Sequence, residues 1–542
     1  MTDALRGRVA AWIAADPDPD SRAELQALLD READEDLAER FAGPLTFGTA
    51  GLRGPLGAGP ARMNVATVRQ ASAGLAAYVR GRGGGSVVVG HDARHGSARF
   101  AREAAAVFSG AGLTTYRLPP LVPTPLLAFG VLQLGCAAGV MVTASHNPKQ
   151  DNGYKVYLGD GAQIAPPADA EIAAEIAAVG PLGDVPLGDG GEAVGEELAE
   201  AYLVAILGAL PAAEARDIRI VYTPLHGVGA PLTLAAFERA GFAPPHVVGA
   251  QAEPDPDFST VDRPNPEEPG TLDLALAEAQ AHGADVMLAH DPDADRLAVA
   301  IPGPDGWRRL HGDETGVLLA DFLLEHTADP ARALLVNTVA STTLLCRLAE
   351  AAGARYIETL SGFKWIMRAP AEAPDHRLLL GYEEALGYAV SDVVRDKDGI
   401  SAALVIAQLA AEEKRAGRTL ADRLDAIAAR FGHHLTDQLT LELPGAEGLD
   451  RIGALTDELR ARPPEALAGR PVERVDDLAA GALGLPRADV LIVRAADTRV
   501  VVRPSGTEPK LKVYLEVRAR DRATGDARLA QLRSELAAVL RP

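Results

Sequence analysis

The sequence contains very little cysteine. Only Cys136 and Cys346 occur among its 542 residues, and both lie in apolar runs that are far apart in the chain. Two separated thiols cannot form a disulfide framework or a zinc site built from several thiolates, so a disulfide-stabilised secreted protein is excluded. This use of cysteine favours a reducing cytoplasm.

The chain also lacks an excess of basic residues. It has 53 Lys and Arg residues against 75 Asp and Glu residues, which gives a formal net charge of −22 at pH 7. So acidic a chain is repelled by nucleic acids and by anionic lipid surfaces, and neither is expected as a partner. An anionic small-molecule substrate would therefore need a local group of positive charges.

No export signal or membrane-spanning segment is predicted. The N-terminal residues contain no basic region followed by an apolar core. The one membrane-like candidate, Leu121 to Ala144, is interrupted by Pro123, Pro125 and Gln133, whereas a spanning helix needs about 20 predominantly apolar residues in a row. We interpret this stretch as buried α/β core and expect no membrane partner. The chain shows no coiled-coil pattern, so its oligomeric state is left open.

What the sequence does contain is a repeated alternation of apolar, β-branched runs with helical stretches. A chain of this length favours three to five domains, at roughly 100–200 residues per domain. Continuous apolar strands separated by helices are typical of parallel sheets that are covered on both faces. We therefore predict an α/β fold of three related domains with mixed or parallel sheets covered by helices, followed by a C-terminal α+β domain. The runs lie at 86–90, 139–142, 218–222, 286–289 and 333–337.

Changes in composition place three domain boundaries. A Gly-, Pro- and Asp-rich stretch precedes residue 198, a Pro-Gly-Pro-Asp-Gly segment occupies 302–306, and the pattern changes to alternating strands after 431–434. Apolar residues at helical spacing also predict an N-terminal helical cap over residues 1–45. The predicted domains are 1–198, 199–305, 306–432 and 433–542.

Ser145 lies in the most informative motif, Thr-Ala-Ser-His-Asn-Pro, directly after the apolar run at 139–142. Ligands of parallel α/β sheets bind beyond the carboxyl ends of the strands, and a serine on such a loop can carry a transferred group. His146 follows it, and Lys155 lies a few residues later. A serine that stores a phosphoryl group needs positive charge around the phosphate oxygens.

Three aspartates in Asp-Pro-Asp-Ala-Asp-Arg form the second motif, which follows the apolar run at 286–289. In an extended loop, Asp291, Asp293 and Asp295 would all point to one side. Carboxylates without cysteine or imidazole suit Mg²⁺. An EF-hand is disfavoured, because Arg296 and an apolar run stand where that loop needs its glycine and its last glutamate.

Two further motifs lie in the second half of the chain. The stretch around Glu383 and Glu384 places adjacent carboxylates among glycines and tyrosines, and carboxylates accept hydrogen bonds from the vicinal hydroxyls of a sugar. The second motif combines a guanidinium, two hydroxyls, a glycine and an ammonium group, which suits a phosphate that is held without being transformed. Its residues are Arg503, Ser505, Gly506, Thr507 and Lys510. Weaker candidates are Arg53 in Phe47–Gly54 and Lys364 beside Trp365.

These motifs, in this order, resemble the α-D-phosphohexomutase superfamily, and most closely its phosphoglucomutase-2/phosphopentomutase-like branch. The resemblance extends over nearly the whole chain and includes Gly90–His95, Tyr222–Gly229, Pro254–Phe258 and Gly362–Trp365. It implies four domains around a central cleft. In order, they would supply a phosphoserine, a metal site, a sugar-binding loop and a phosphate-binding loop.

The resemblance also implies the roles of individual residues. Ser145 would be the phosphoserine and would bind Mg²⁺ together with Asp291, Asp293 and Asp295. The enzyme would pass its phosphoryl group to a sugar monophosphate, form a sugar bisphosphate that also serves as the activator, and recover the other phosphate. Glu383 and Glu384 would hold the ring hydroxyls, while the loop of Arg503 would grip the phosphate that is not reacting. The reacting end would be lined by Arg53, His146, Lys155, Arg296 and Lys364, and Lys397 would be a further substrate-binding residue.

Two departures from the family pattern leave alternatives open. Ala385 stands where many hexose-specific members have a serine, and residues 386–399 contain no histidine that could act as general base. The base is therefore open among His146, Lys155 and Lys397. The function expected is a mutase for glucose or mannose 1-phosphate/6-phosphate. A phosphopentomutase for ribose or deoxyribose phosphates is the alternative, and a silent phosphosugar-binding protein is a third reading.

Overall fold

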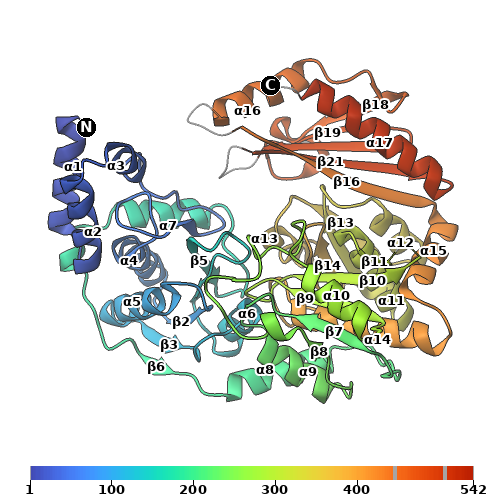
Figure 1. The fold of residues 1–542 in the computed structure, drawn as a ribbon, viewed down its shortest axis with the longest axis horizontal. Coiled ribbons are helices and arrows are strands. Elements are labelled where there is room, and N and C mark those ends of the chain that lie inside the picture. Colours follow the sequence, from blue (N-terminus) through green and yellow to red (C-terminus); the bar gives the residue numbers. More distant parts are fainter. Residues whose placement is uncertain (1, 305, 444–447, 505–509, 541–542) are drawn as a thin grey trace. The chain divides into compact units, whose positions relative to one another are not determined.

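The structure is a computed structural model that describes residues 2–304, 306–443, 448–504 and 510–540 (Figure 1). It divides into two compact units. The first contains Met1–Arg309 and Gly387–Glu412, and the second contains Leu310–Leu386 and Glu413–Pro542. Four sheets with helices packed on them confirm the predicted α/β architecture with a C-terminal α+β domain.

The N-terminal helical cap predicted from the spacing of leucines is confirmed. Its helices bury Leu5, Val9, Leu25, Leu28 and Leu37 in one small cluster. Proline in the first turn and an Asp18 side chain that accepts from the Asp20 amide start the second helix, as expected for a helix N-terminus. The helices are α1 (Asp3–Ala15), α2 (Pro19–Asp30) and α3 (Asp34–Arg40).

The first sheet has six strands in the order β1-β5-β4-β2-β3-β6. Strands β4, β2, β3 and β6 pair in parallel, and β5 pairs antiparallel with β4 and β1. The strands are β1 (Leu52–Pro55), β2 (Ser86–His91), β3 (Thr114–Arg117), β4 (Ala138–Val142), β5 (Asp151–Leu158) and β6 (Glu192–Ala193). The helices are α4 (Val65–Gly81), α5 (Ser97–Gly110), α6 (Thr124–Gln133), α7 (Ala168–Ala177) and α8 (Glu197–Gly208).

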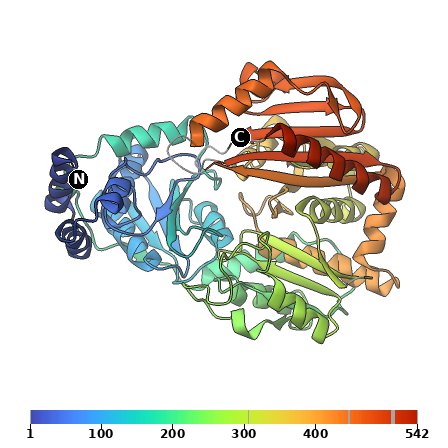
Figure 2. The ribbon, with the colours of Figure 1, turned by 45° about the horizontal axis from the view of Figure 1, so that its top comes forward.

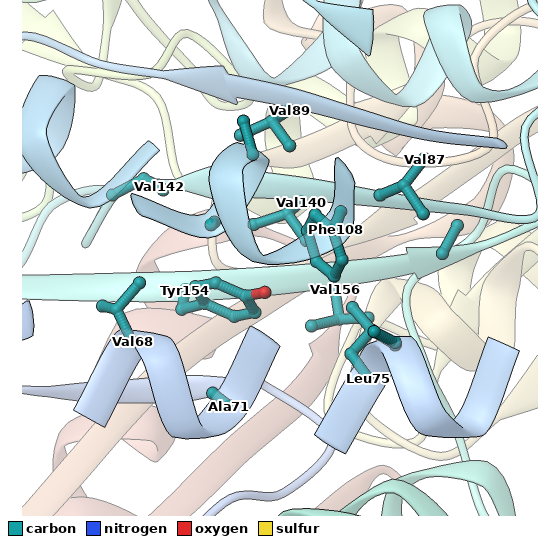
Figure 3. Packing of buried hydrophobic residues seen from close by; sticks show 14 of the residues in the cluster. Val68, Ala71, Leu75, Val87, Val89, Phe108, Val140, Val142, Tyr154 and Val156 are labelled. Carbon is teal, nitrogen blue, oxygen red and sulfur yellow. The ribbon is translucent and has the colours of Figure 1, made fainter. Parts of the chain in front are cut away.

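The core of this first domain lies between the sheet and helices α4, α5 and α7. Figure 3 shows Val68, Ala71 and Leu75 of α4 facing Tyr154 and Val156 of β5. Each fully buried aliphatic side chain stabilises the fold by about 1.5–3 kcal/mol relative to an exposed one. The stretch that we interpreted as buried core forms α6 and β4. Within the residues described here, none of the helices is long and apolar enough to cross a membrane.

The second sheet has the order β11-β10-β9-β7-β8. Its strands β9, β7 and β8 pair in parallel, whereas β10 and β11 continue the sheet in antiparallel pairing as far as Arg309. The strands are β7 (Ile220–Thr223), β8 (His246–Val247), β9 (Val286–His290), β10 (Leu297–Gly303) and β11 (Gly306–Arg309). Helices α9 (Ala230–Arg239) and α10 (Asp273–Ala281) belong to this domain. The chain returns to the first unit with β15 (Gly387–Ala389) and with most of α14 (Gly399–Arg415).

The second unit contains a parallel sheet and an antiparallel one. In the parallel sheet β12 pairs with both β13 and β14. Its strands are β12 (Ala333–Thr338), β13 (Arg355–Thr359) and β14 (Arg377–Glu383). Its helices are α11 (Gly312–His326), α12 (Leu344–Ala352), α13 (Phe363–Ile366) and α15 (Leu420–Phe431).

The C-terminal sheet has the order β16-β21-β20-β19-β18-β17, and α16 and α17 pack on one of its faces (Figure 2). The side chains of its other face alternate with these and pack on Val339 and Leu360 of the preceding domain. The strands are β16 (His433–Glu442), β17 (Ala466–Leu467), β18 (Arg470–Asp477), β19 (Leu491–Ala495), β20 (Thr498–Pro504) and β21 (Lys510–Ala519). The helices are α16 (Gly448–Ala461) and α17 (Arg522–Val539).

Candidate active site

Ser145 lies on the loop between β4 and β5, as its position after an apolar strand predicted. Its backbone has φ of 51°, a left-handed conformation that is costly for a residue with a side chain and is typical of functional sites. The loop is tied to the sheet because the Ser145 amide donates to Thr143 Oγ1 at 2.9 Å and that hydroxyl donates to Asp92 at 2.6 Å. The side chain is buried, and Oγ donates to Asp291 Oδ2 at 2.6 Å.

The three aspartates converge, but on a turn and not on an extended loop. The Ala294 amide donates to the Asp291 carbonyl, and Ala294 has φ of 54°. This tight turn brings one carboxylate oxygen from each of Asp291, Asp293 and Asp295 within 4.8 Å of the others. The predicted convergence is confirmed, while the predicted period of two is wrong, because the left-handed residue reverses the chain between Asp293 and Asp295.

Two lysines neutralise part of this acidic cluster. Lys155 Nζ donates to Asp293 Oδ2 at 2.7 Å and to Asp295 Oδ2 at 2.8 Å, and Lys397 Nζ lies 3.3 Å from the same Asp295 atom. Thr124 Oγ1 also donates to Asp293 Oδ2 at 2.7 Å. The Asp293 and Asp295 Oδ2 atoms are thereby occupied, whereas their Oδ1 atoms are buried without a hydrogen-bond partner among the described residues.

Burial and mutual repulsion separate the acidities of the three carboxyl groups. Burial raises the pKa of Asp291 well above its usual range, and the charges of Asp293 and Asp295 raise it further. Burial also tends to raise the pKa of Asp293 and Asp295, but the charges and hydrogen bonds around them together outweigh it and lower both pKa values. Lys155 acts on both groups, Thr124 adds a hydrogen bond to Asp293, and Lys397 and Arg296 add positive charge beside Asp295. The pair bonded to Lys155 therefore carries the negative charge of the cluster.

Mg²⁺ fits this donor set. The three aspartates bring hard carboxylate oxygens together, and one of these residues accepts from the Ser145 hydroxyl. Two further oxygens of the cluster are buried and lack a partner among the described residues. An orphaned buried carboxylate oxygen costs free energy unless a cation or a hydrogen-bond donor satisfies it. Asp291, Asp293 and Asp295 are the residues that would hold the ion, with an oxygen on Ser145 as a further ligand.

His146 lies beside the serine, in an environment that favours the neutral imidazole. Its Nδ1 is 3.1 Å from Ser145 Oγ. Burial lowers its pKa well below the usual value, and the positive charges of Arg296 and Arg53 lower it further. By contrast, burial tends to lower the pKa of Lys155, but the negative charges of Asp293 and Asp295 outweigh that effect and raise it. Of these two candidates for the general base, the imidazole is the one that is unprotonated near neutral pH.

The structure also places Arg53 and Arg296 near the serine loop. Arg53 Nη1 donates to Asn147 Oδ1 at 3.3 Å, and the Arg296 amide donates to Asp291 Oδ1 at 3.1 Å. Arg53 lies in β1 and Arg296 directly before β10. The geometry of the first unit thus brings Arg53, His146, Lys155, Arg296 and Lys397 together around Ser145 and the aspartates.

Arg94 is a positioning residue that the sequence reasoning missed. Its guanidinium donates to the carbonyls of Ser145 at 2.6 Å, Asn147 at 2.5 Å, Pro148 at 2.8 Å and Asp151 at 3.1 Å. The side chain is almost fully buried. One planar cation therefore fixes the backbone of the whole serine loop. The signal in the sequence was an arginine two residues after Asp92, at the carboxyl end of an apolar strand.

We expect Arg94→Lys to fold but to lower kcat by about 10- to 100-fold, as for other residues that orient a catalytic group. A lysine keeps the charge but cannot reach four carbonyls with a planar fork of donors. Initial rates and the rate of Ser145 phosphorylation check this result. Arg99→Lys is the matched control, because Arg99 is a half-exposed arginine of α5 that is bonded to Asp18. Equal kcat values in the two variants would contradict the role of Arg94.

In the second unit, Glu383 is the last residue of β14 and Glu384 lies on the following turn. Glu384 is buried, and its Oε2 accepts from Ser341 Oγ at 3.1 Å and from Thr338 Oγ1 at 3.3 Å. Thr338 is the last residue of β12, which lies beside β14, and Ser341 is on the segment that follows it. These two partners were missed, although their position at the carboxyl end of a parallel strand was a usable signal.

The remaining predicted residues of this unit lie in separate elements. Lys364 is in the short helix α13, and Arg503 is near the end of β20, directly opposite Lys512 of β21. Lys510 Nζ lies 3.2 Å from Glu442 Oε1. Lys512 was not singled out from the sequence, although it is adjacent to the motif. The predictions for Ser505, Gly506 and Thr507 lie outside the described residues.

Asp313, at the start of α11, is a buried carboxyl group close to the glutamate loop. Its Oδ1 accepts from the Thr342 amide at 2.8 Å and from the Tyr382 hydroxyl at 3.3 Å. Burial raises its pKa to about 6, against the favourable charge of His311 and the Thr342 hydrogen bond. Because the folded protein holds this proton more tightly than the unfolded chain, the group stabilises the fold below about pH 4. That contribution is lost as the pH rises through about 6.

Asp313→Asn is expected to remove this dependence on pH. The amide keeps an acceptor for Thr342 and carries no buried charge, so we expect the variant to exceed the wild type in stability by about 3 kcal/mol at pH 8 and to match it near pH 4. Denaturation midpoints at pH 4, 6 and 8 measure the difference, with Asp329→Asn on an exposed turn as the control. A wild type that is more stable at pH 8 would show that the charged form is stabilised.

All four domains match one known protein family. The family descriptions are "Phosphoglucomutase/phosphomannomutase, alpha/beta/alpha domain I" for residues 44–181, domain II for 200–303, domain III for 311–431 and the C-terminal domain for 458–538. The chain belongs to the phosphoglucomutase/phosphomannomutase family. This membership confirms the resemblance read from the motifs and makes the protein an intramolecular phosphotransferase of the mutase type.

Relatives of this phosphoglucomutase/phosphomannomutase family member carry the names of three mutases. A "Probable phosphomannomutase" of Haemophilus influenzae is 41% identical and covers 88% of this chain and 98% of its own length. A "Probable phosphoribomutase" of Schizosaccharomyces pombe is 36% identical, with 95% and 94% covered. A "Phosphoglucomutase" of Staphylococcus aureus is 32% identical, with 91% and 93% covered. The family is thus shown, whereas the sugar differs among these names.

A solved structure agrees with this membership. A protein from Thermus thermophilus superposes with a TM-score of 0.72 at 27% identity, covering 92% of this chain and 99% of the other. A phosphoglucomutase/phosphomannomutase family protein from Burkholderia thailandensis has a TM-score of 0.71 at 22% identity, with 91% and 96% covered, and supports the fold.

Proposed function

We propose that this mutase moves a phosphoryl group between the 1-position and the terminal hydroxyl of glucose or mannose phosphate. The reaction would pass through a phosphoserine at Ser145 and a bisphosphorylated sugar. The observation that carries the proposal is the Ser145 hydroxyl, which lies on a left-handed loop residue and is bonded at 2.6 Å to one aspartate of the convergent triad. A hydroxyl bonded to one carboxylate of a cluster that two lysines contact suits the storage of a phosphoryl group.

The residues of the first unit would act on the transferred phosphate. With Ser145 phosphorylated, Lys155, Arg53 and Arg296 supply fixed positive charge around the phosphate oxygens, and no reorganisation of solvent is needed. A sugar hydroxyl attacks the phosphorus and loses its proton to His146. The bond from phosphorus to Ser145 Oγ breaks, its electron pair stays on Oγ, and Oγ takes up a proton from His146, whose Nδ1 lies 3.1 Å away. Mg²⁺ held by the three aspartates would supply further charge to the phosphoryl oxygens.

The residues of the second unit would hold the part of the substrate that does not react. Glu383 and Glu384 accept hydrogen bonds from ring hydroxyls. Lys364, by contrast, adds positive charge for the reacting phosphate, and Lys397 of the first unit also binds the substrate. The other phosphate is gripped by Arg503, Ser505, Gly506, Thr507 and Lys510. A sugar bisphosphate carries a phosphate at each end. The same two groups of residues therefore serve both half-reactions, once the intermediate has turned round so that its other phosphate faces Ser145.

A phosphopentomutase is the second candidate, and two observations favour it. Ala385 offers no side-chain hydroxyl directly after the glutamate pair. In addition, the relative named as a phosphoribomutase is similar over 95% of this chain. A pentose phosphate is shorter by one carbon and its reacting hydroxyl is on C5, so the choice depends on how far the two phosphates are held apart.

Initial rates with glucose 1-phosphate, mannose 1-phosphate and ribose 1-phosphate test the proposal, each with Mg²⁺ and a trace of the matching bisphosphate. We expect kcat/KM for a hexose 1-phosphate to exceed that for ribose 1-phosphate by at least about 10-fold, because the hexose offers one more hydroxyl-bearing carbon for the site to recognise. A preference for ribose would assign the protein to the pentose branch. No turnover with any of the three, or release of inorganic phosphate faster than isomerisation, would overturn the mutase proposal.

A further inference from the structure

We infer that the second unit contains an anion site, separate from the proposed phosphate loop, that binds a phosphate group and acts as an effector site. The site is a cavity of about 290 Å³, near the lower end of the range for small-molecule sites. Five arginines and His434 contribute to its wall, against three carboxylates. The arginines are Arg347, Arg474, Arg494, Arg499 and Arg518, and the carboxylates are Glu473, Asp497 and Glu516.

Strand pairing explains why these charges gather. Arg474 pairs with Arg494, Arg494 with Arg499, and Arg499 with Glu516 across β18, β19, β20 and β21. Side chains at paired positions lie on the same face of a sheet. These four paired side chains, Arg474, Arg494, Arg499 and Glu516, therefore form a charged row on the face opposite to α16 and α17. Arg518 extends it, because it lies two residues beyond Glu516 on β21.

The row is separate from the proposed phosphate loop. On the same face, the next layer is apolar and consists of Ile492, Val501 and Tyr514, which are also paired with one another. Arg503 lies beyond that layer, four residues along β20 from Arg499. At about 3.4 Å per residue, their Cα atoms are roughly 14 Å apart. A phosphate in the cavity would therefore not be the one that Arg503 holds.

Two observations point to an anionic ligand. His434 is buried, with 2% of its side chain exposed, and its Nδ1 lies 3.0 Å from Glu516 Oε1, while its Nε2 has no hydrogen-bond partner in the described structure. A histidine bonded to a carboxylate by one nitrogen has an N–H donor to offer from the other when it is protonated. Arg347 is exposed at the cavity and has no carboxylate within ion-pair distance among the described residues.

The other arginines retain donors despite their carboxylate partners. Arg494 uses Nε to bond Asp476 at 3.1 Å, and Arg518 uses Nη2 to bond Asp497 at 2.9 Å. Each guanidinium has five N–H donors, so several remain for the oxygens of a phosphate, which arginine binds in a bidentate manner. Four of the arginines are held in place by the carboxylates Glu358, Asp476, Asp497 and Glu516. Among the residues that line the cavity, the five arginines outnumber the three carboxylates.

The wall of the cavity is bonded to the segment that holds Glu384. Glu516 Oε1 accepts from Thr342 Oγ1 at 2.6 Å and from the Thr343 amide at 2.8 Å. Arg499 Nη2 donates to the Ser341 carbonyl, and the Ser341 hydroxyl donates to Glu384. An anion that draws Arg499 or His434 away from Glu516 would therefore shift the residues that orient the sugar-binding glutamate. This contact chain assigns an effector role to the site.

Sulfate binding to the full chain tests the site directly, by equilibrium dialysis in the Arg503→Gln background so that the proposed phosphate loop does not contribute. We expect Arg494→Gln and Arg347→Gln each to weaken binding about 10-fold. His434→Asn keeps a donor toward Glu516 but removes Nε2, and it should weaken binding at least about 3-fold. Arg522→Gln, on an exposed position of α17, is the matched control and should leave the affinity unchanged. Unchanged sulfate affinity in Arg494→Gln and His434→Asn would overturn the site, whatever the fate of the mutase proposal.

The effector role has a separate readout. Sulfate that competes at the active site changes KM but leaves kcat unchanged at saturating sugar phosphate. We expect bound sulfate to change kcat of the wild type at least about 2-fold, and Arg494→Gln to abolish that change at the same sulfate concentration. A wild-type kcat that does not respond to sulfate, with sulfate shown to be bound, would overturn the effector role.

Discussion

Replacing Ser145 with alanine is expected to lower turnover of sugar phosphate by at least about 10⁴-fold, because no other group can carry the phosphoryl intermediate. The side chain is buried and its only described acceptor is Asp291, apart from the contact with His146. Alanine fits the space, so the fold should persist. Binding of a sugar monophosphate should stay within about 10-fold of the wild type, since the substrate contacts lie on other residues.

Two measurements check the role of Ser145. Transfer of label from a ³²P-labelled sugar bisphosphate to the protein should occur in the wild type and be absent from Ser145→Ala. Ser534→Ala, on the exposed face of α17, controls for the loss of a hydroxyl and should label and turn over normally. Residual isomerisation within about 10-fold of the wild type, or label on another residue, would refute a phosphoserine at this position.

Asp293→Asn is expected to have the second largest effect, a loss of about 10³-fold in kcat. The amide matches the carboxylate in size and can still accept from Thr124. It removes, however, one of the two negative charges, on Asp293 and Asp295, to which Lys155 donates. It also removes one of the oxygens that fit Mg²⁺. The concentration of Mg²⁺ needed for half-maximal activity should rise about 10-fold or more.

A titration of activity with Mg²⁺ separates these two effects. Restoration of full kcat at high Mg²⁺ would show that Asp293 contributes only to affinity for the metal, contrary to the role proposed for it in holding Lys155. Asp262→Asn, an exposed loop carboxylate of the same domain, is the control and should leave both values unchanged. Wild-type activity of Asp293→Asn at low Mg²⁺ would exclude the triad as the metal site.

Much of the candidate site could be predicted because its residues are contiguous in the sequence. Ser145 and Asp291 each follow an apolar strand, and a parallel sheet places the ends of such strands at one edge. The prediction that Asp291, Asp293 and Asp295 converge was right, but the reason was wrong, since the left-handed Ala294 makes a turn. Alanine rarely adopts a left-handed conformation, so local propensity does not predict this turn. The surrounding contacts impose the conformation.

Arg94 and Thr124 could not have been assigned roles in the same way. Each acts on a group far away in sequence: Arg94 on carbonyls of the Ser145 loop, and Thr124 on Asp293, which is 169 residues later. Such contacts follow from how distant segments pack within the first unit. Their side chains look like ordinary residues of a strand end and of a helix start.

The sequence by itself determined the family, the four-domain α/β order, and the serine, aspartate and glutamate motifs, because residue type and local spacing carry that chemistry. Only the tertiary structure decided which oxygens are paired. It showed that Lys155 bridges Asp293 and Asp295, that burial beside Ser145 lowers the pKa of His146, and that an apolar layer separates the row around Arg499 from Arg503. Pairing, burial and electrostatic shifts depend on distances between distant segments, and those distances are set by packing and not by sequence order.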